Sequence, residues 1–145
     1  MSTVQALLDA KGHKVMTTDR GIPVLDVVKQ MVAANISAVM ITDAKGRLVG
    51  IFTERDVSRR VVAEELDPAS TPVGEVMTEG VAYGTPQMTI EEARALMVNG
   101  RLRHLPIQDE EYKLVGIISM TDLNAHEVGR VEDVITTPRP TGTKI

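Results

Sequence analysis

An internal repeat constrains this sequence more than any other feature. When the chain is shifted by 66 residues, residues 14–57 align with residues 80–123 without a gap. The coinciding pairs include Met31 and Met97, Asp43 and Asp109, Gly50 and Gly116, and Asp56 and Asp122. A unit of this length cannot comfortably bury a core alone, so two copies have to cover each other. We therefore predict two units packed face to face about a pseudo-twofold axis.

Apolar residues recur at helical spacing early in each unit and predict an amphipathic helix there. The second of these helices opens with Thr89 and Glu92, which form a capping-box pattern. The side chains expected on the two buried faces are Val24, Val27, Val28, Met31 and Val32 in the first unit, and Ile90, Ala93, Met97 and Val98 in the second.

After the helix, each unit has two apolar runs separated by a polar turn, at 38–52 and 105–118. Such a pattern predicts a β-hairpin. Short first strands are expected at Val15 and Val81, and last helices near Glu54 and Met120. The predicted fold class is therefore α/β (α+β), with tandem β-α-β-β-α repeats.

The repeat also sets the expected domain boundaries. We assign residues 4–66 to the first unit, residues 73–128 to the second and residues 129–145 to a C-terminal tail. Residues 73–77 are expected to begin the second unit, and residues 4–8 are expected to play the same part for the first.

Composition excludes several classes of protein. The 145 residues include 0 cysteines, which rules out disulfide scaffolds and thiolate zinc sites. Only 2% of the residues are aromatic and the net charge is −4, which argues against a nucleic-acid partner. No apolar run approaches the roughly 18 residues of a membrane helix, and no signal-peptide pattern is seen. We expect a cytoplasmic protein with no membrane partner.

The sequences Thr53-Glu54-Arg55-Asp56 and Ser119-Met120-Thr121-Asp122 allow two interpretations. Each can be a helix N-cap in which the aspartate bonds back to the capping residue. Each can also be a ligand site, because a helix N-terminus favours phosphate and an ionised aspartate accepts bonds from ribose hydroxyls. Gly50 would then allow close approach of the ligand to the backbone. The recurrence of the pattern favours the ligand interpretation.

The same segments give the chain a family resemblance. The runs 49–57, 73–78, 101–107 and 115–123 resemble a pair of CBS (cystathionine-β-synthase) domains, the tandem called a Bateman module, over residues 4–128. The resemblance implies a stand-alone regulatory module that binds an adenine nucleotide such as AMP, ADP, ATP or NAD between its units, with no obligatory cofactor. It also implies a homodimer and an unknown protein target to which ligand binding is relayed.

A basic group precedes the second hairpin and suits phosphate. The family resemblance places Arg101, Arg103 and His104 towards ligand phosphates, and an arginine fork pairs well with phosphate oxygens. Ser37 and Ala38 occupy the matching positions of the first unit. We therefore expect the first site to lack this clamp, unless Arg55 supplies the charge, and the two sites to differ in affinity.

The resemblance further implies that the adenine lies between the first strand of a unit and its hairpin. This points to Thr17, Thr18, Ile36 and Ala38 in one site, and to Val81, Tyr83, Leu102 and Leu105 in the other. Tyr83 is expected either to stack on a base or to block the pocket. The full predicted ligand-binding set is Thr17, Ser37, Ala38, Thr53, Arg55, Asp56, Val81, Tyr83, Arg101, Arg103, His104, Leu105, Pro106, Ser119 and Asp122.

Two other functions compete with the sensor. An enzyme is not expected, because His13, His104 and His126 lack metal-ligand spacing, and no phosphate-binding loop or nucleophile elbow is present. The predicted catalytic and metal sets are therefore empty. The alternative is a dimeric protein-interaction adaptor that works without a ligand.

Overall fold

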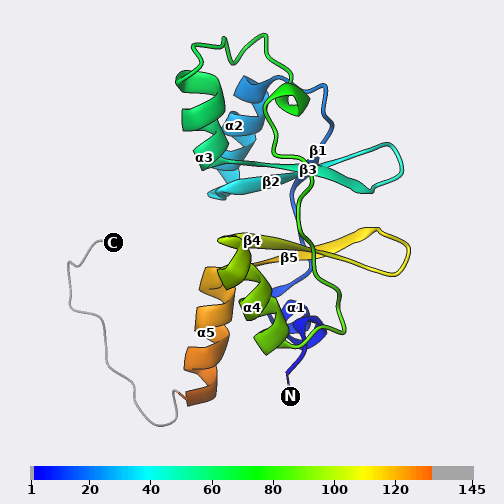
Figure 1. Ribbon diagram of the computed structural model, residues 1–145. Helices are drawn as coiled ribbons and strands as arrows, with labels where there is room; N and C mark the ends of the chain where they lie inside the picture. The colour runs from blue at the N-terminus through cyan, green and yellow to red at the C-terminus, as the bar shows by residue number, and fades with distance from the viewer. Residues whose placement is uncertain (1, 132–145) are drawn as a thin grey trace, which may run out of the picture.

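The computed structural model describes residues 2–131 and contains two lobes of similar build (Figure 1). The upper lobe contains β1 (Thr17–Thr18), α2 (Val24–Ala34), β2 (Ala38–Thr42), β3 (Leu48–Thr53), α3 (Glu54–Asp56) and the π-helical η1 (Val57–Val62). The lower lobe contains α1 (Val4–Lys11), α4 (Ile90–Gly100), β4 (His104–Gln108), β5 (Leu114–Ser119) and α5 (Met120–Val131). The short helix η2 (Val73–Glu75) follows η1 after residues 63–72. The predicted α+β class is confirmed, whereas most of the predicted tail, residues 132–145, lies outside the described residues.

The two hairpins show the repeat most clearly. Strand β2 pairs antiparallel with β3, and β4 pairs antiparallel with β5. Both ladders shift register at equivalent places, between Ile41 and Thr42 and between Ile107 and Gln108. The hairpin turns also match, because the aspartate at each turn accepts two backbone N–H bonds of 2.8–3.0 Å. Local sequence therefore builds the same hairpin twice.

The first strands of the two units differ. Strand β1 runs parallel to β2, and Met40 N donates to Met16 O at 3.0 Å. The strand predicted at Val81 does not form, and only a single bridge joins Gly84 to Ile107. Pro106 stands where the first unit has Met40 and has no N–H to donate. The second unit therefore loses one rung of the parallel ladder.

Two apolar cores, one per lobe, hold the elements together. Met31 and Met97 are buried as expected. The prediction for Val32 and Val98 is wrong, because their side chains are 76% and 57% exposed. These two valines lie at equivalent positions on α2 and α4 and leave a small apolar surface on each helix.

The entry segments of the two units are exchanged relative to expectation. Residues 4–8 were expected to serve the first unit, yet Val4, Leu7 and Leu8 belong to the core of the second. Residues 73–77 instead pack on the first unit, where Val73 and Met77 are buried. Figure 1 shows α1 in the lower lobe, before the chain climbs to β1. The exchange ties the lobes together twice, while the predicted boundaries at residues 66 and 73 stay a prediction.

The glycines of the repeat explain how these segments fit. A Cβ at Gly116 would lie 2.7 Å from Leu8 Cδ2, and one at Gly50 would lie 2.5 Å from Met77 Sδ. The expectation that Gly50 makes room for a ligand is therefore wrong, because Met77 already fills that space. Within residues 2–131, no helix combines the length and apolarity needed to cross a membrane.

Candidate functional site

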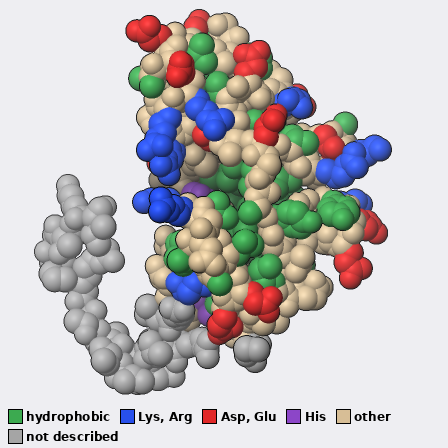
Figure 2. Space-filling view, viewed as in Figure 1, with side chains coloured by type: hydrophobic (Ala, Val, Ile, Leu, Met, Phe, Trp, Pro, Cys, Tyr) green, Lys and Arg blue, Asp and Glu red, His purple; other side chains and the backbone are tan. Residues whose placement is uncertain are grey.

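A pocket of about 1100 Å³ lies where the two units meet, and we call it the central pocket. Figure 2 shows basic side chains gathered around this waist of the molecule, next to a histidine. Its lining comes from both units: Ser37, Ile51, Thr53, Glu54, Arg55 and Thr78 on one side, and Gly80, Val81, Ala82, Leu96, Asn99, Gly100, Arg101, Leu102, Arg103 and His104 on the other.

A capping box at the end of β3 fixes the first-unit side of the central pocket. Thr53 N donates to Asp56 Oδ2 at 2.9 Å, and Asp56 N donates to Thr53 Oγ1 at 3.4 Å. Asp56 Oδ1 also accepts the Thr78 hydroxyl at 3.2 Å and lies 3.5 Å from Arg60 Nε. These partners hold Asp56 behind the wall, only 7% exposed, while Thr53 and Arg55 line the pocket.

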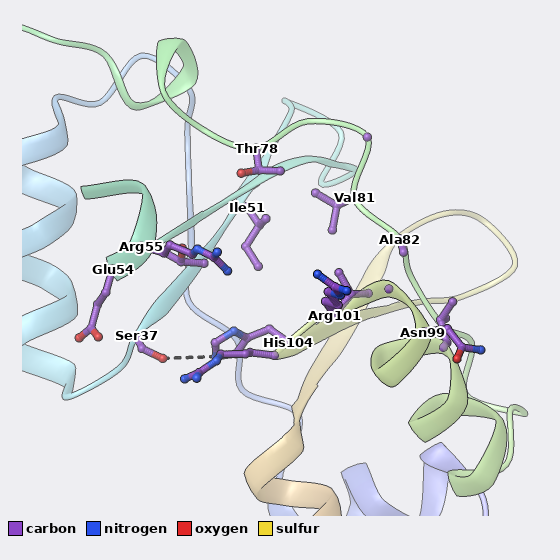
Figure 3. A pocket seen from close by; sticks show the side chains of 16 residues that line it. Ser37, Ile51, Glu54, Arg55, Thr78, Val81, Ala82, Asn99, Arg101 and His104 are labelled. Carbon is purple, nitrogen blue, oxygen red and sulfur yellow. Dashed lines mark hydrogen bonds between the residues drawn. The ribbon is translucent and has the colours of Figure 1, made fainter. Parts of the chain in front are cut away.

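The C-terminal end of α4 builds the opposite side. Arg101 caps this helix in the left-handed conformation with φ 55°, and Leu102 N donates to Met97 O at 2.8 Å. This sharp exit turns the chain from α4 into β4 and leaves Arg101 and Arg103 exposed. Val81 and Ile51 supply apolar surface between the two sides (Figure 3).

The charged groups make the central pocket cationic. Arg55 and Arg101 both extend into the space between the units, whereas the Glu54 carboxylate points away from them (Figure 3). Ser37 Oγ and His104 Nε2 lie 3.3 Å apart and join the two units. Burial lowers the pKa of His104, although Asp122 and Glu54 partly oppose this effect. Since a lowered pKa keeps the imidazole neutral near pH 7, the positive charge comes from the arginines.

The structure brings part of the predicted set together. Its members that line the central pocket are Ser37, Thr53, Arg55, Val81, Arg101, Arg103 and His104. The members that do not line it are Thr17, Ala38, Asp56, Tyr83, Leu105, Pro106, Ser119 and Asp122. Leu105 and Pro106 are buried in β4. Tyr83 makes an edge-on contact with Tyr112, with 6.5 Å between ring centroids.

The grouping of these residues differs from the expected one. Thr53 and Arg55 of the first unit face Val81 and Arg103 of the second in one pocket, rather than Thr17 and Ala38 of their own unit. The exchanged entry segments cause this arrangement, because Thr78 pairs with β3 and carries the following residues across the first unit. Arg101 and Arg103 therefore lie in the same pocket as Thr53, where we expected no basic group from the second unit. That they clamp phosphate stays a prediction.

Several lining residues escaped the sequence analysis. Thr78, Gly80 and Ala82 flank the predicted Val81, and Leu96 and Asn99 lie on α4. Leu96 and Asn99 are three residues apart and share a face of α4, which ends at the basic group. This helical spacing was the signal that could have found them.

The second cap of the repeat forms a separate constellation. Ser119 N donates to Asp122 Oδ2 at 2.8 Å, and Asp122 N donates to Ser119 Oγ at 3.0 Å. Lys11 Nζ also approaches Asp122 Oδ2, at 2.6 Å. We call Ser119, Asp122 and Lys11 the Asp122 site.

Comparison with known proteins agrees with this architecture. YhcV of Bacillus subtilis, a CBS domain-containing protein, is 33% identical over 128 residues, 88% of this chain and 87% of that protein. The Arabidopsis thaliana protein CBSCBSPB2 is 34% identical over 119 residues, or 82% of this chain, which spans only 22% of that longer relative. Among solved structures, the CBS-domain containing protein ATU1752 from Agrobacterium tumefaciens superposes with a TM-score of 0.80 at 33% identity, covering 87% of this chain and 99% of that one.

A more distant structure shares the fold. The CBS domain pair of protein MJ0100, solved in complex with 5-methylthioadenosine and S-adenosyl-L-methionine, has a TM-score of 0.80 at 22% identity and covers 90% of this chain and 98% of its own. A family model for the CBS domain matches residues 11–63 and again residues 73–129. The chain therefore belongs to the CBS domain family, as a tandem pair of CBS domains.

Proposed function

We propose that the central pocket binds an adenosine-containing ligand that carries phosphate, such as AMP, ADP, ATP or NAD. The observation that carries the proposal is the pairing of an apolar wall with three arginines, Arg55, Arg101 and Arg103, in one pocket. The wall formed by Ile51 and Val81 suits a flat base, and the guanidinium groups suit phosphate oxygens. The adenosine-containing ligands of the MJ0100 domain pair support the class of ligand.

The proposed role is regulatory rather than catalytic, and it includes a cytoplasmic location, where the nucleotide pool lies. A ligand in the central pocket touches both units, so it favours the arrangement in which Arg55 and Arg103 are correctly spaced. The ligand can shift the equilibrium only by its difference in affinity for the two arrangements. A partner protein that binds one arrangement better would then respond to the ligand.

Calorimetric titration of the chain with AMP, ATP, NAD and S-adenosylmethionine tests the proposal. We expect saturable binding of at least one phosphorylated adenosine ligand, with adenosine alone binding more weakly. Absence of binding by all of them would refute the sensor, and turnover of any of them would show an enzyme.

A dimeric adaptor is the second candidate, and the exposed valines favour its dimer. Val32 lies beside a groove between α2 and α3, and Val98 occupies the equivalent place on α4. We propose that a second copy covers these side chains, giving a particle near twice 15.8 kDa. Light scattering should show this dimer, and Val32→Asp should weaken it. A ligand-free dimer that still captures its target would favour the adaptor.

A further inference from the structure

The caps of the two units are equivalent up to the aspartate and then diverge. Asp56 and Asp122 each accept the N–H of the capping residue, at 2.9 and 2.8 Å. In the first unit the next partner is Thr78, whose hydroxyl donates to Asp56 and whose N–H donates to Ile51 O at 2.8 Å. Thr78 lines the central pocket, so these contacts define one wall of a ligand site.

In the second unit a single ammonium group performs both of these tasks. Lys11 Nζ donates to Asp122 Oδ2 at 2.6 Å and to Ile117 O at 2.8 Å. Ile117 is the counterpart of Ile51 in the repeat. The lysine comes from the last turn of α1, which packs on β5, and the ion pair is only about a quarter exposed, at 28% and 24% for the two side chains.

The charge of Lys11 changes what the Asp122 site can hold. Thr78 contributes one neutral hydroxyl, but an ammonium group contributes three donors and a positive charge directly on the carboxylate. A ribose hydroxyl would have to displace this charge-assisted bond, which is stronger than the neutral bond it would form. The counterparts of the arginines that would help a nucleotide compete are Thr121 for Arg55 and Asn35 for Arg101.

We propose that Lys11 acts as a built-in occupant of the Asp122 site, so that each chain binds a single adenosine ligand, in the central pocket. This inference rests on the proposed function for the location of that one ligand. It assigns Lys11 a role in setting the number of sites.

Calorimetric stoichiometry of the full chain tests the inference, with AMP and, separately, adenosine as probes. Adenosine is uncharged and does not need the missing arginines. The wild type should bind one ligand per chain. Lys11→Ala should bind two adenosines, because the substitution frees Asp122 and the Ile117 carbonyl. Lys29→Ala, which removes an exposed lysine from α2, is the matched control and should bind one.

The outcomes separate the inference from the proposed function. Two ligands per wild-type chain, or one adenosine on both the wild type and Lys11→Ala, would overturn the inference and leave the proposed function standing. No binding to the wild type would refute the proposed function. A single site gained by Lys11→Ala would then still support the role of Lys11 at the Asp122 site, and no gain would overturn that role as well. If Lys11→Ala does not fold, Asp122→Asn decides: unchanged AMP binding supports the inference, and a tenfold loss overturns it.

Discussion

The central pocket and the Asp122 site start from the same local sequence and end as different environments. Both contain a strand that leads into a capped helix, with the same carboxylate bonding back to the same backbone position. In the central pocket, the exchanged entry segments bring Arg55, Arg101 and Arg103 together. At the Asp122 site, the exchanged segment α1 contributes one lysine, Lys11. The comparison shows that the duplication repeats the strand, the helix cap and the aspartate, whereas residues distant in the sequence decide what each copy can bind.

Removal of Arg103 should separate the two environments most strongly. Arg103→Ala should lower the affinity for AMP about ten- to a hundredfold, because a hydrogen bond to a charged group contributes about 1.5–3 kcal/mol. Adenosine should lose much less. Arg103→Lys should rescue only part of the loss, since a point charge cannot reproduce the planar fork. Calorimetry at two salt concentrations measures this, and the AMP preference should shrink at high salt because Arg103 is exposed.

Arg59→Ala is the matched control for this experiment, because Arg59 is exposed on η1 and outside the pocket lining. Its affinity for AMP should equal that of the wild type. Equal losses of AMP and adenosine affinity on Arg103→Ala would mean that Arg103 supports the pocket wall and does not contact phosphate.

The paired glycines compare the packing of the two units. Gly50→Ala would place a Cβ 3.0 Å from the Thr78 carbonyl oxygen as well as against Met77, and a backbone atom cannot easily move away. The three atoms nearest to a Cβ at Gly116 all belong to the side chain of Leu8, which can move more easily than a backbone atom. Overpacking typically costs about 1–3 kcal/mol. We expect Gly50→Ala to lie at the upper end of this range and Gly116→Ala at the lower end, as measured by chemical denaturation. The reverse order would contradict the exchanged packing.

The two aspartates should differ in stability. Loss of a cap costs about 0.5–2 kcal/mol. Asp56→Ala should cost more than Asp122→Ala, because Asp56 is only 7% exposed and its loss removes the acceptor of both the Thr78 hydroxyl and Arg60. Lys11 loses its ion pair in Asp122→Ala, but it keeps the Ile117 carbonyl and is partly exposed to water. Thermal and denaturant unfolding measure the difference. That Asp56 contacts ribose stays a prediction, and an Asp56→Ala variant with full stability and weakened AMP and adenosine binding would support it over the structural role.

The smallest expected effect is a pH dependence from His104. The pKa of the folded state is lowered by burial below the usual value of 6.5. The unfolded chain therefore binds this proton more readily, and the stability contributed by neutral His104 falls as the pH drops below 6.5. A bound phosphate would raise the pKa of His104. The contribution of His104 to AMP affinity should therefore increase as the pH falls below 6.5. The pH dependence of AMP affinity should be smaller for His104→Asn than for its parent, both made in a His13→Asn background because the Asp9 carboxylate raises the pKa of His13. The remaining slope belongs to the phosphate of AMP, whose second pKa is about 6. If His104→Asn leaves the pH dependence of AMP affinity unchanged, His104 does not contribute to it.

Much of the secondary structure of each unit was predictable because it depends on local chemistry. The hairpins, the turn aspartates and the caps at Thr53 and Ser119 repeat at a fixed interval, and each is determined by residues a few positions apart. The basic residues Arg101 and Arg103 of the central pocket were also found, because they match positions that the family resemblance places towards phosphate. Local signals of this kind do not depend on how the two units are joined.

The grouping of these residues could not be predicted. The gapless alignment begins at residue 14, so residues 4–8 had no register against residues 73–77, and either segment could have served either core. The contact of Lys11 with Asp122 joins residues 111 positions apart, and no periodicity signals such a pair. Pro106, by contrast, is a signal that the sequence does contain, because a proline inside a strand has no N–H for a neighbouring strand.

A crystal structure of the chain grown with AMP would test the central claim most directly. We predict one AMP per chain in the central pocket, with its phosphate beside Arg55 and Arg103 and the pair of Lys11 with Asp122 still closed. AMP bound on Asp122 with Lys11 displaced, or phosphate far from these arginines in the central pocket, would contradict it.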